Sequence, residues 1–332
     1  MAEARERGVN EERANAAREA AARVVANVER VTLGKRHVIV HALAALLSEG
    51  HVLFEDVPGV AKTMLARSLA VSLGCQFRRI QCTPDLLPTE VTGSSVYNQK
   101  TTEFEFRAGP IFTNLLLADE INRATPRTQA ALLECMAEGQ VSADGVTYEL
   151  PKPFVVLATQ NPMEQEGTFP LPEAQLDRFL VRLSVGYPSL SAEQDMLERQ
   201  KLQHPIDSLQ PVLTPLEFLQ LQRTAREVYV HEQVRAYIVQ LVHASRRHEH
   251  VALGGSPRAS LALYRTAQAL ALIAGRTIRG QLVVLPDQVQ EMFPYVMAHR
   301  LIIKPESRLE GIDARQVADD LVTTVAAPVA RG

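Results

Sequence analysis

Residues 51–63 read HVLFEDVPGVAKT, and this stretch decides the fold. Residues 52–54 are an apolar run fit for a central strand. Pro58 and the following glycine turn the chain directly after it. A helix is predicted from Lys62, because apolar residues recur at helical spacing up to a suitable C-cap at Gly74. The order strand, loop, helix places backbone N–H groups and a helix N-terminus around one point, and such a point attracts phosphate.

The loop departs twice from the phosphate-loop pattern G-x-x-x-x-G-K-[ST], with Asp56 at the first glycine and Ala61 at the second. Alanine is acceptable at the second place provided that the position does not demand a positive φ. The alternative is an ordinary strand-to-helix turn carrying a surface lysine. The candidate nucleotide contacts are Gly59, Val60, Ala61, Lys62, Thr63 and Met64.

Length and composition indicate an ordinary globular protein with two domains. The chain has 332 residues, 46% hydrophobic and 22% charged, with a formal charge of −3. No apolar run approaches the roughly 18 residues of a membrane helix. The charged N-terminus lacks the apolar segment of a secretory signal, so a cytoplasmic protein without membrane insertion is expected. Three cysteines without metal-ligand spacing suit reduced thiols.

The segment before the phosphate strand predicts two helices. Residues 1–10 form a frayed tail, and an Ala-rich helix follows over about 10–30. Gly34 then breaks the pattern before a second helix that ends at Gly50. A loop at Gly34 could hold an adenine ring, and a simple helix connector is the equal alternative.

A second apolar run, residues 115–118, ends in Asp119 and Glu120. Ligands bind at the carboxyl ends of strands in open α/β sheets, so this placement matters more than the charge itself. Asp119 could hold Mg²⁺, and Glu120 could orient or deprotonate an attacking water. The alternative is an acidic strand end that caps a neighbouring helix.

A third apolar run, residues 154–158, is followed by Asn161. Its amide could bond the attacking water or the terminal phosphate, and the alternative is turn formation before Pro162. Arg178 closes a short helix further on. It is either a surface ion-pair residue or a cation directed at a neighbouring subunit.

Two hairpins are predicted as insertions between these strands. Residues 96–106 (VYNQKTTEFEF) alternate around a polar turn. Residues 141–150 (VSADGVTYEL) alternate around Asp144-Gly145, a dipeptide typical of a two-residue hairpin turn.

From residue 188 the sequence is helical, so we expect a nucleotide-binding domain over 11–187 and a helical domain over 188–332. Ser256 and Pro257 begin one helix and leave Arg258 in its first turn. Because a helix N-terminus disfavours cations, this placement suggests an anion for Arg258 to meet. The histidine-rich segment 243–250 is interpreted as a solvated helix end. The predicted helices cover about 192–203, 215–228, 232–247, 257–274 and 287–299.

Taken together, the ordered set resembles the AAA+ ATPases, and within them the MoxR family of the helix-2-insert branch, from about Ala14 to Gly311. The resemblance is carried by EDVPGVAKTMLARSLA, QCTPDLLPTEVTGSSVY, GPIFTNLLLADEINRATPRTQAALLECMAEGQV, LATQNPMEQEGTFPLPEAQLDRF and GGSPRASLAL. It implies an α/β fold, with a P-loop parallel sheet core flanked by helices and a C-terminal all-α lid domain.

The resemblance also implies roles for single residues and for ATP with Mg²⁺. Lys62 contacts the β- and γ-phosphates, while Thr63 and Asp119 hold Mg²⁺. Glu120 completes the acidic motif. The remaining roles are first sensor for Asn161, arginine finger in trans for Arg178 and second sensor for Arg258, with Arg123 and Arg127 as further finger candidates.

The function implied is ATP hydrolysis coupled to remodelling or maturation of client proteins. Because each site would be completed by a neighbour, a ring is expected, with six copies. A von Willebrand A-domain protein and a client are the partners implied. A nucleic-acid motor is a weaker alternative, since the acidic composition does not favour it, and a nucleotide-binding scaffold without turnover is another. A GTPase is weakest, because no N-K-x-D element follows the acidic strand.

Overall fold

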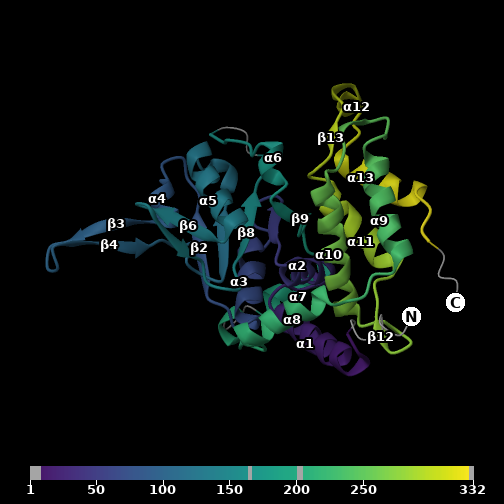
Figure 1. Cartoon of the computed structure of the whole chain (residues 1–332), viewed down its shortest axis with the longest axis horizontal. Helices are drawn as coiled ribbons and strands as arrows, with labels where there is room; N and C mark the ends of the chain where they lie inside the picture. Colours follow the sequence, from purple (N-terminus) through teal and green to yellow (C-terminus); the bar gives the residue numbers. More distant parts are fainter. Residues whose placement is uncertain (1–8, 164–166, 200–204, 329–332) are drawn as a thin grey trace.

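We describe a computed structural model of the chain, which covers residues 9–163, 167–199 and 205–328. Its centre is a five-stranded parallel sheet in the order β2-β5-β8-β1-β9 (Figure 1). Its strands are β1 (His51–Glu55), β2 (Phe77–Gln81), β5 (Leu115–Asp119), β8 (Val155–Gln160) and β9 (Phe179–Leu183). The predicted parallel core is confirmed.

The alternation of side chains along the strands divides the core into two layers. Val52 and Phe54 of β1 pack on one face of the sheet, and Leu53 packs on the other. Helices α1 (Glu11–Glu29), α2 (Arg36–Leu47) and α3 (Lys62–Ser72) cover the first face, and α5 (Pro126–Glu138) covers the second. A parallel sheet buried on both faces explains why its strands read as continuous apolar runs.

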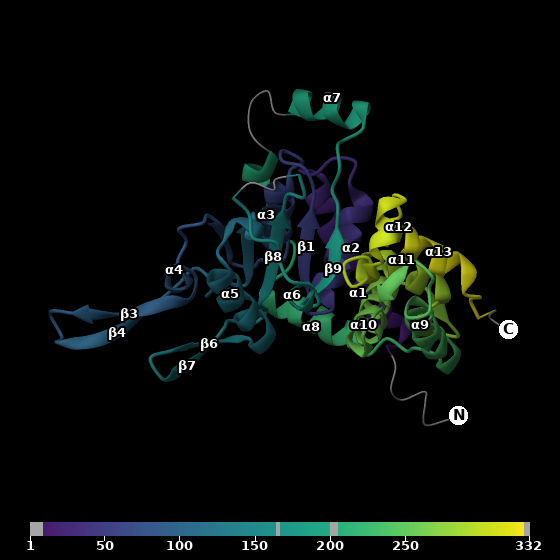
Figure 2. The same cartoon turned by 90° about the horizontal axis from the view of Figure 1, so that it is seen from above.

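Both predicted hairpins are confirmed, and they extend from the same end of the molecule (Figure 2). The first is β3 (Gly93–Asn98) with β4 (Glu103–Ala108), which follows the short α4 (Pro88–Thr92). The second is β6 (Gln140–Ala143) with β7 (Val146–Glu149). Asp144 and Gly145 have φ of 51° and 78°, the two positive values of a type I′ turn. Short turns at η1 (Ile121–Arg123) and α6 (Glu173–Leu176) complete this half.

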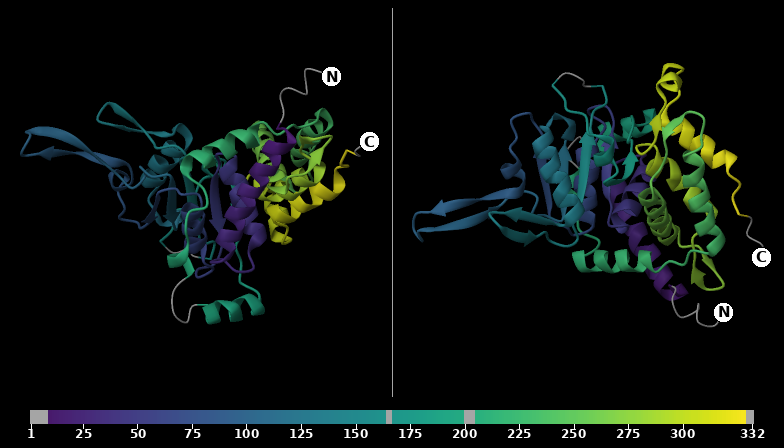
Figure 3. Two further views of the ribbon diagram at one scale, coloured as in Figure 1. Left: turned by 90° about the horizontal axis from the view of Figure 1, so that it is seen from below. Right: turned by 45° about the horizontal axis from the view of Figure 1, so that its top comes forward.

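The C-terminal region is helical, as predicted, and lies at the end of the molecule opposite the hairpins (Figure 3). It also holds features that were not predicted: two small antiparallel ribbons and two final helices. The helix predicted over 192–203 begins at Leu190 and is described to Arg199; residues 200–203 lie outside the described part. The elements are α7 (Leu190–Arg199), η2 (Pro205–Ser208), α8 (Pro215–Arg226), α9 (Glu232–Ser245), β10 (Val251–Leu253), α10 (Pro257–Ala274), β11 (Thr277–Ile278), β12 (Gln281–Leu282), α11 (Pro286–Met297), β13 (Ile302–Ile303), α12 (Pro305–Leu309) and α13 (Ala314–Thr324).

One apolar cluster runs from α1–α3 into the lid helices α8–α11 without a break. The boundary at residue 187 therefore stays a prediction, because the two proposed units share their core. None of the described helices has the length and apolar composition needed to cross a bilayer.

Arg300, which follows α11, joins the lid to the first residues of β9. Its guanidinium is almost fully buried and donates to Asp177 Oδ1 at 2.7 Å and to the carbonyl of Phe179 at 2.8 Å. The neighbouring His299 donates from Nε2 to that same Phe179 carbonyl at 3.0 Å. The lid is thus tied to the amino end of β9.

Candidate functional site

The phosphate loop has the strand-loop-helix form predicted, but Ala61 departs from the condition set for it. Gly59 and Ala61 have φ of 83° and 61°, so both occupy the left-handed region. An L-residue other than glycine pays about 1–2 kcal/mol for such a conformation. The condition under which alanine was judged acceptable is therefore not met, because Ala61 has a positive φ at the turn into α3.

Three backbone N–H groups point out of the N-terminus of α3. The first helical hydrogen bond joins the N–H of Leu65 to the carbonyl of Ala61 at 2.9 Å. The N–H groups of Lys62, Thr63 and Met64 precede it and so have no acceptor within the helix. Unpaired donors at the positive end of a helix form an anion site.

Lys62 lies close to the acidic strand ends. Its Nζ donates to the carbonyl of Asp56 at 2.8 Å, within its own loop. Burial lowers the pKa of the Lys62 ammonium, while the negative charges of Asp56, Asp119 and Glu120 oppose that shift. A half-buried cation facing several carboxylates suits a site that binds phosphate together with a metal ion.

Asp56 has a structural task that sequence reasoning did not find. Its Oδ2 accepts from the N–H groups of Val185 and Gly186, both at 2.7 Å, and from Ser184 Oγ at 3.0 Å. Its Oδ1 caps the N–H of Val57 at 3.0 Å. The carboxylate therefore ties the start of the loop to the segment after β9, which no glycine could do.

Asp119 is held from two sides. Its Oδ1 accepts from Thr159 Oγ1 at 2.6 Å, and its Oδ2 accepts from Arg79 Nε at 3.0 Å and Arg79 Nη2 at 2.7 Å. Gln81 also accepts from Arg79, at 2.7 Å. The strand register brings Arg79, Gln81 and Asp119 together, because Gln81 pairs with Asp119 on the neighbouring strand. Neither Arg79 nor Thr159 was a candidate from sequence. Arg79 lies in the middle of β2 and Thr159 near the end of β8, and these two strands flank β5.

Glu120 follows directly in a left-handed conformation, with φ of 55°. Its Oε2 accepts from Gln81 Nε2 at 2.9 Å and from Arg123 Nη1 at 3.2 Å. Its N–H donates to Thr159 Oγ1 at 2.8 Å. A strained backbone at a non-glycine residue is a feature that gathers at functional sites.

Asn161 follows β8, so it lies at the same edge of the sheet as the residues after β1 and β5. Its Oδ1 accepts from the N–H of Met163 at 3.1 Å. This hydrogen bond agrees with the alternative role of Asn161, which is to form the turn around Pro162. Its side chain is buried, and the Nδ2 donors are not used by any described hydrogen bond.

The two arginines predicted for the site, Arg178 and Arg258, lie far from the phosphate loop of their own chain. Arg178 directly precedes β9 and donates from Nη1 to the carbonyl of Leu133 in α5. Arg258 is 75% exposed, and its Nη1 lies 3.9 Å from Asp177 Oδ2. Since β9 runs parallel to β1, both arginines flank the amino ends of the strands, while the phosphate loop follows the carboxyl end of β1. A strand of five residues separates these edges by roughly 17 Å. Within one chain, Arg258 therefore does not complete the site of Lys62.

Gly34 has φ of 68° and lies in the turn between α1 and α2. A Cβ placed there would lie 3.3 Å from the Cβ of Ala192, so α7 packs on this turn. Nearby in the chain, Thr32 Oγ1 is buried and has no partner within the described residues. This hydroxyl is enclosed by protein, so the adenine-holding role of the Gly34 loop stays a prediction.

The metal expected with ATP has a suitable but small donor set. Thr63 and Asp119 are the candidate ligands, and the described residues contain no group of three His, Cys, Asp or Glu that could hold a metal by themselves. Mg²⁺ commonly takes one or two protein ligands together with substrate phosphates and water. The residues therefore fit Mg²⁺ delivered with a nucleotide.

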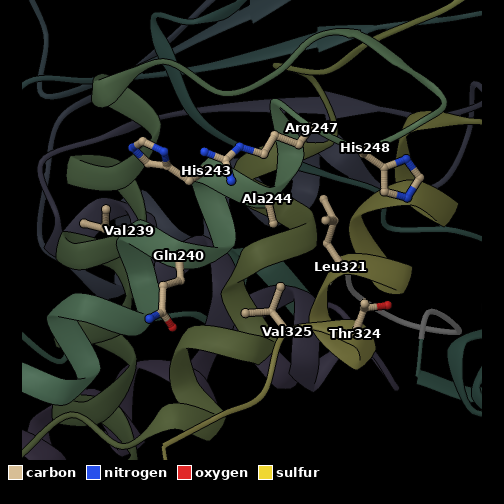
Figure 4. A pocket seen from close by; sticks show the side chains of 9 residues that line it. All are labelled: Val239, Gln240, His243, Ala244, Arg247, His248, Leu321, Thr324 and Val325. Atoms are coloured by element: carbon tan, nitrogen blue, oxygen red, sulfur yellow. The ribbon is translucent and has the colours of Figure 1, made fainter.

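The described surface also has a shallow hollow of about 600 Å³ in the lid, between α9 and α13 (Figure 4). Val239, His243 and Arg247 line it from one side, and Leu321 and Val325 line it from the other. None of the phosphate-loop or acidic residues borders it. We assign no catalytic role to this hollow.

A parallel sheet with a phosphate loop after β1, an acidic pair after β5, a polar residue after β8 and a helical lid defines the P-loop ATPases of the AAA class. Two family models agree: "ATPase family associated with various cellular activities (AAA)" over residues 51–181 and "AAA lid domain" over 243–325.

Relatives narrow the assignment. Chaperone MoxR1 of Mycobacterium tuberculosis is 42% identical over 92% of this chain and 82% of its own length. The uncharacterized protein YeaC of Bacillus subtilis is 51% identical over 93% and 95%. A crystal structure named "putative ATPase", from Cytophaga hutchinsonii, is 36% identical, with a TM-score of 0.88 over 96% of this chain and 98% of its own. The chain belongs to the MoxR family of AAA+ ATPases.

Proposed function

We propose that this chain binds ATP with Mg²⁺, hydrolyses it to ADP and phosphate, and uses the cycle to remodel client proteins as a ring. The observation that supports this most is that Lys62, Asp119 and Glu120 converge at one edge of the sheet. Phosphoryl transfer requires positioning and neutralisation of charge, which these groups supply without covalent chemistry.

In this proposal Lys62 and the N–H groups at the start of α3 hold the β- and γ-phosphates. Thr63 and Asp119 hold Mg²⁺, whose chemistry is to neutralise charge on the phosphate oxygens. Glu120 accepts a proton from the attacking water, and Asn161 orients that water or the terminal phosphate. The loop at Gly34, with Gly59, Val60, Ala61 and Met64, surrounds the rest of the nucleotide.

The arginines act across a subunit boundary. Arg178 and Arg258 lie together at the edge opposite their own phosphate loop. Contact between that edge of one copy and the phosphate-loop edge of another would complete each site, and an arginine supplied in trans contributes about 10³–10⁵ in rate. This arrangement repeats from copy to copy and closes as a ring, which we propose to be a hexamer in the cytoplasm.

The client activity is proposed from the relative named Chaperone MoxR1. A von Willebrand A-domain protein is proposed as the partner that brings clients to the ring. The hairpins β3–β4 and β6–β7 extend from the body and are the proposed client-contacting elements.

The test is Glu120→Gln in the purified chain at assembling concentrations. We expect Mg²⁺-dependent ATP turnover in the wild type, a loss of at least about 100-fold in the variant, and unchanged ATP affinity. Glu134→Gln, on the exposed side of α5, is the matched control and should retain turnover. Equal turnover in Glu120→Gln and wild type would remove Glu120 from the mechanism, and an inactive wild type would refute hydrolysis.

A further inference from the structure

Helix α7 stands apart from the rest of the molecule (Figure 2). Ala192 is the only buried residue among its described side chains, whereas Leu190 and Leu197 are 78% and 68% exposed. A helix of ten residues is marginal in water without tertiary packing. An element so short and so poorly packed needs a further contact to hold its conformation.

The exposed leucines of α7 form one face, and it points away from the chain. At about 100° per residue, Leu190 and Leu197 lie about 160° and about 140° around the helix from Ala192, on the opposite side. Glu193 and Glu198 flank the pair, one on each side, and both are exposed. The outer face of α7 is therefore an apolar centre between carboxylates.

Helix α10 carries an exposed apolar residue between two cations. Arg258, Leu261 and Arg265 are exposed and share one strip of the helix, since they lie at positions i, i+3 and i+7. Leu261 is 58% exposed. The only described ion pair of Arg258 is the 3.9 Å approach to Asp177, and no hydrogen bond or ion pair of the Arg265 side chain is found in the described part of the chain.

These two faces cannot meet within one chain. Ala192 packs on the Gly34 turn, and Asp56 binds the N–H of Gly186, so α7 lies beside the phosphate loop. The first turn of α10 lies beside Asp177, at the amino end of β9. The strip and the α7 face therefore sit at opposite edges of the sheet.

We propose that the outer face of α7 in one copy docks on the Arg258–Leu261–Arg265 strip of a second copy. The leucines pack together, and Glu193 and Glu198 face the arginines. The docking carries Arg258 towards the phosphate loop that α7 flanks. This inference rests on the proposed ATPase and names the element that joins neighbouring copies.

Cross-linking between single-cysteine variants tests the contact directly. Leu197→Cys and Leu261→Cys are purified separately, mixed with an ATP analogue that resists hydrolysis, and treated with a short bismaleimide. The native cysteines are buried and do not compete. We expect a covalent dimer in the mixture and none from either variant alone. Leu197→Cys mixed with Leu309→Cys controls for collision, because Leu309 is 90% exposed on α12.

A charge exchange tests the specificity of the pairing. Glu193→Arg with Glu198→Arg should raise the concentration for half-assembly, measured by sedimentation, by about tenfold or more. Arg265→Glu should weaken assembly in the same direction. Mixing these two variants should restore assembly in part, because the contacts then alternate. One contact pairs the unaltered α7 face of the Arg265→Glu variant with the unaltered strip of the other variant, and the next places the introduced arginines opposite the carboxylate at position 265. Asp195→Arg changes the same charge away from the outer face and should leave assembly unchanged.

The outcomes separate this inference from the proposed function. A wild type that assembles and hydrolyses ATP without a 197–261 cross-link would overturn the docking and leave the ATPase standing. A 197–261 cross-link in a chain that does not hydrolyse ATP would support the docking and refute the proposed ATPase. Failure of the charge-exchanged mixture to assemble, with each variant folded by circular dichroism, would also refute the pairing.

Discussion

The guanidinium of Arg79 donates twice to Oδ2 of Asp119, from Nε at 3.0 Å and from Nη2 at 2.7 Å. Asp119 is the carboxylate proposed to hold Mg²⁺, so a protein cation already neutralises one of its two oxygens. Any metal ion that binds there must compete with Arg79 for Asp119.

Arg79→Ala should therefore strengthen the response to Mg²⁺. The Mg²⁺ concentration needed for half-maximal ADP affinity should fall about threefold to tenfold, since a partly exposed ion pair contributes about 1 kcal/mol. Titration calorimetry of ADP at several Mg²⁺ concentrations measures this. Arg78→Ala, one residue away on β2, is the control. An unaltered Mg²⁺ dependence in Arg79→Ala would mean that the pair does not compete with the metal.

Asp56→Ala should lower the free energy of unfolding by about 3 kcal/mol, because it leaves the buried N–H of Val185 and the partly buried N–H of Gly186 without their acceptor. Urea unfolding followed by circular dichroism measures the loss. Asp85→Ala, at an exposed carboxylate, should remain close to wild type. Near-equal stability of the two variants would show that the link from the loop to the segment after β9 contributes little.

Ala61→Gly should raise the free energy of unfolding by up to about 1 kcal/mol, because glycine adopts the left-handed conformation without the steric penalty of a Cβ. Ala66→Gly, inside α3, should act in the opposite sense, since glycine destabilises a helix interior. Thermal unfolding of both variants checks the signs. A destabilised Ala61→Gly would show that the alanine methyl makes a contact worth more than the strain.

Stability should fall in mild acid through His51. Its Nδ1 accepts from the N–H of Val156 at 3.0 Å and its Nε2 donates to the carbonyl of Met136 at 3.0 Å, so the neutral ring is required. Burial lowers the pKa of His51 to about 4, below the ordinary 6.5. The unfolded chain therefore binds a proton first as the pH falls, and the native state loses stability between about pH 6.5 and pH 4.

This loss should reach about 2 kcal/mol between pH 7.5 and pH 5. Urea unfolding of wild type and His51→Gln at both pH values isolates the contribution, because buried His299 shifts in the same direction in both proteins. The variant should be less stable at pH 7.5 and less sensitive to pH. If wild type and His51→Gln lost the same stability between the two pH values, groups other than His51 would cause the loss.

Arg258→Ala and Arg300→Ala should separate assembly from folding. Arg258 is largely exposed, so its removal should leave the free energy of unfolding within about 0.5 kcal/mol of wild type while turnover at assembling concentrations falls. Arg300 is buried on Asp177, and its loss should cost about 3–5 kcal/mol. Denaturant unfolding and ATP turnover of both variants provide the comparison. A strongly destabilised Arg258→Ala would assign that arginine to the fold.

Much of the architecture was predictable because it follows from neighbouring residues. The apolar runs at 52–54 and 115–118 became buried parallel strands, and Asp144-Gly145 formed the predicted turn. Helix α10 begins at the predicted Ser-Pro start and covers the predicted residues 257–274. Helix α13 was missed although its sequence carries helix signals: Asp313 and Gln316 form a capping box, and the buried residues Val317 and Leu321 lie at helical spacing.

The site was predictable only in part. Lys62, Asp119 and Glu120 could be placed together from strand order, because parallel strands bring their carboxyl ends to one edge. The partners that hold them could not, since Arg79 and Thr159 become neighbours of Asp119 through sheet register rather than sequence spacing.

The sequence alone indicated that a phosphate loop, an acidic pair and a polar strand end would share one sheet edge, because local patterns set the strands and parallel strands bring their carboxyl ends to one edge. Only the tertiary structure decided the left-handed backbone at Ala61, the partners of Asp56 and the edge at which Arg258 lies. Those features depend on contacts between segments that are distant along the chain. Such contacts are fixed by the packing of the whole core.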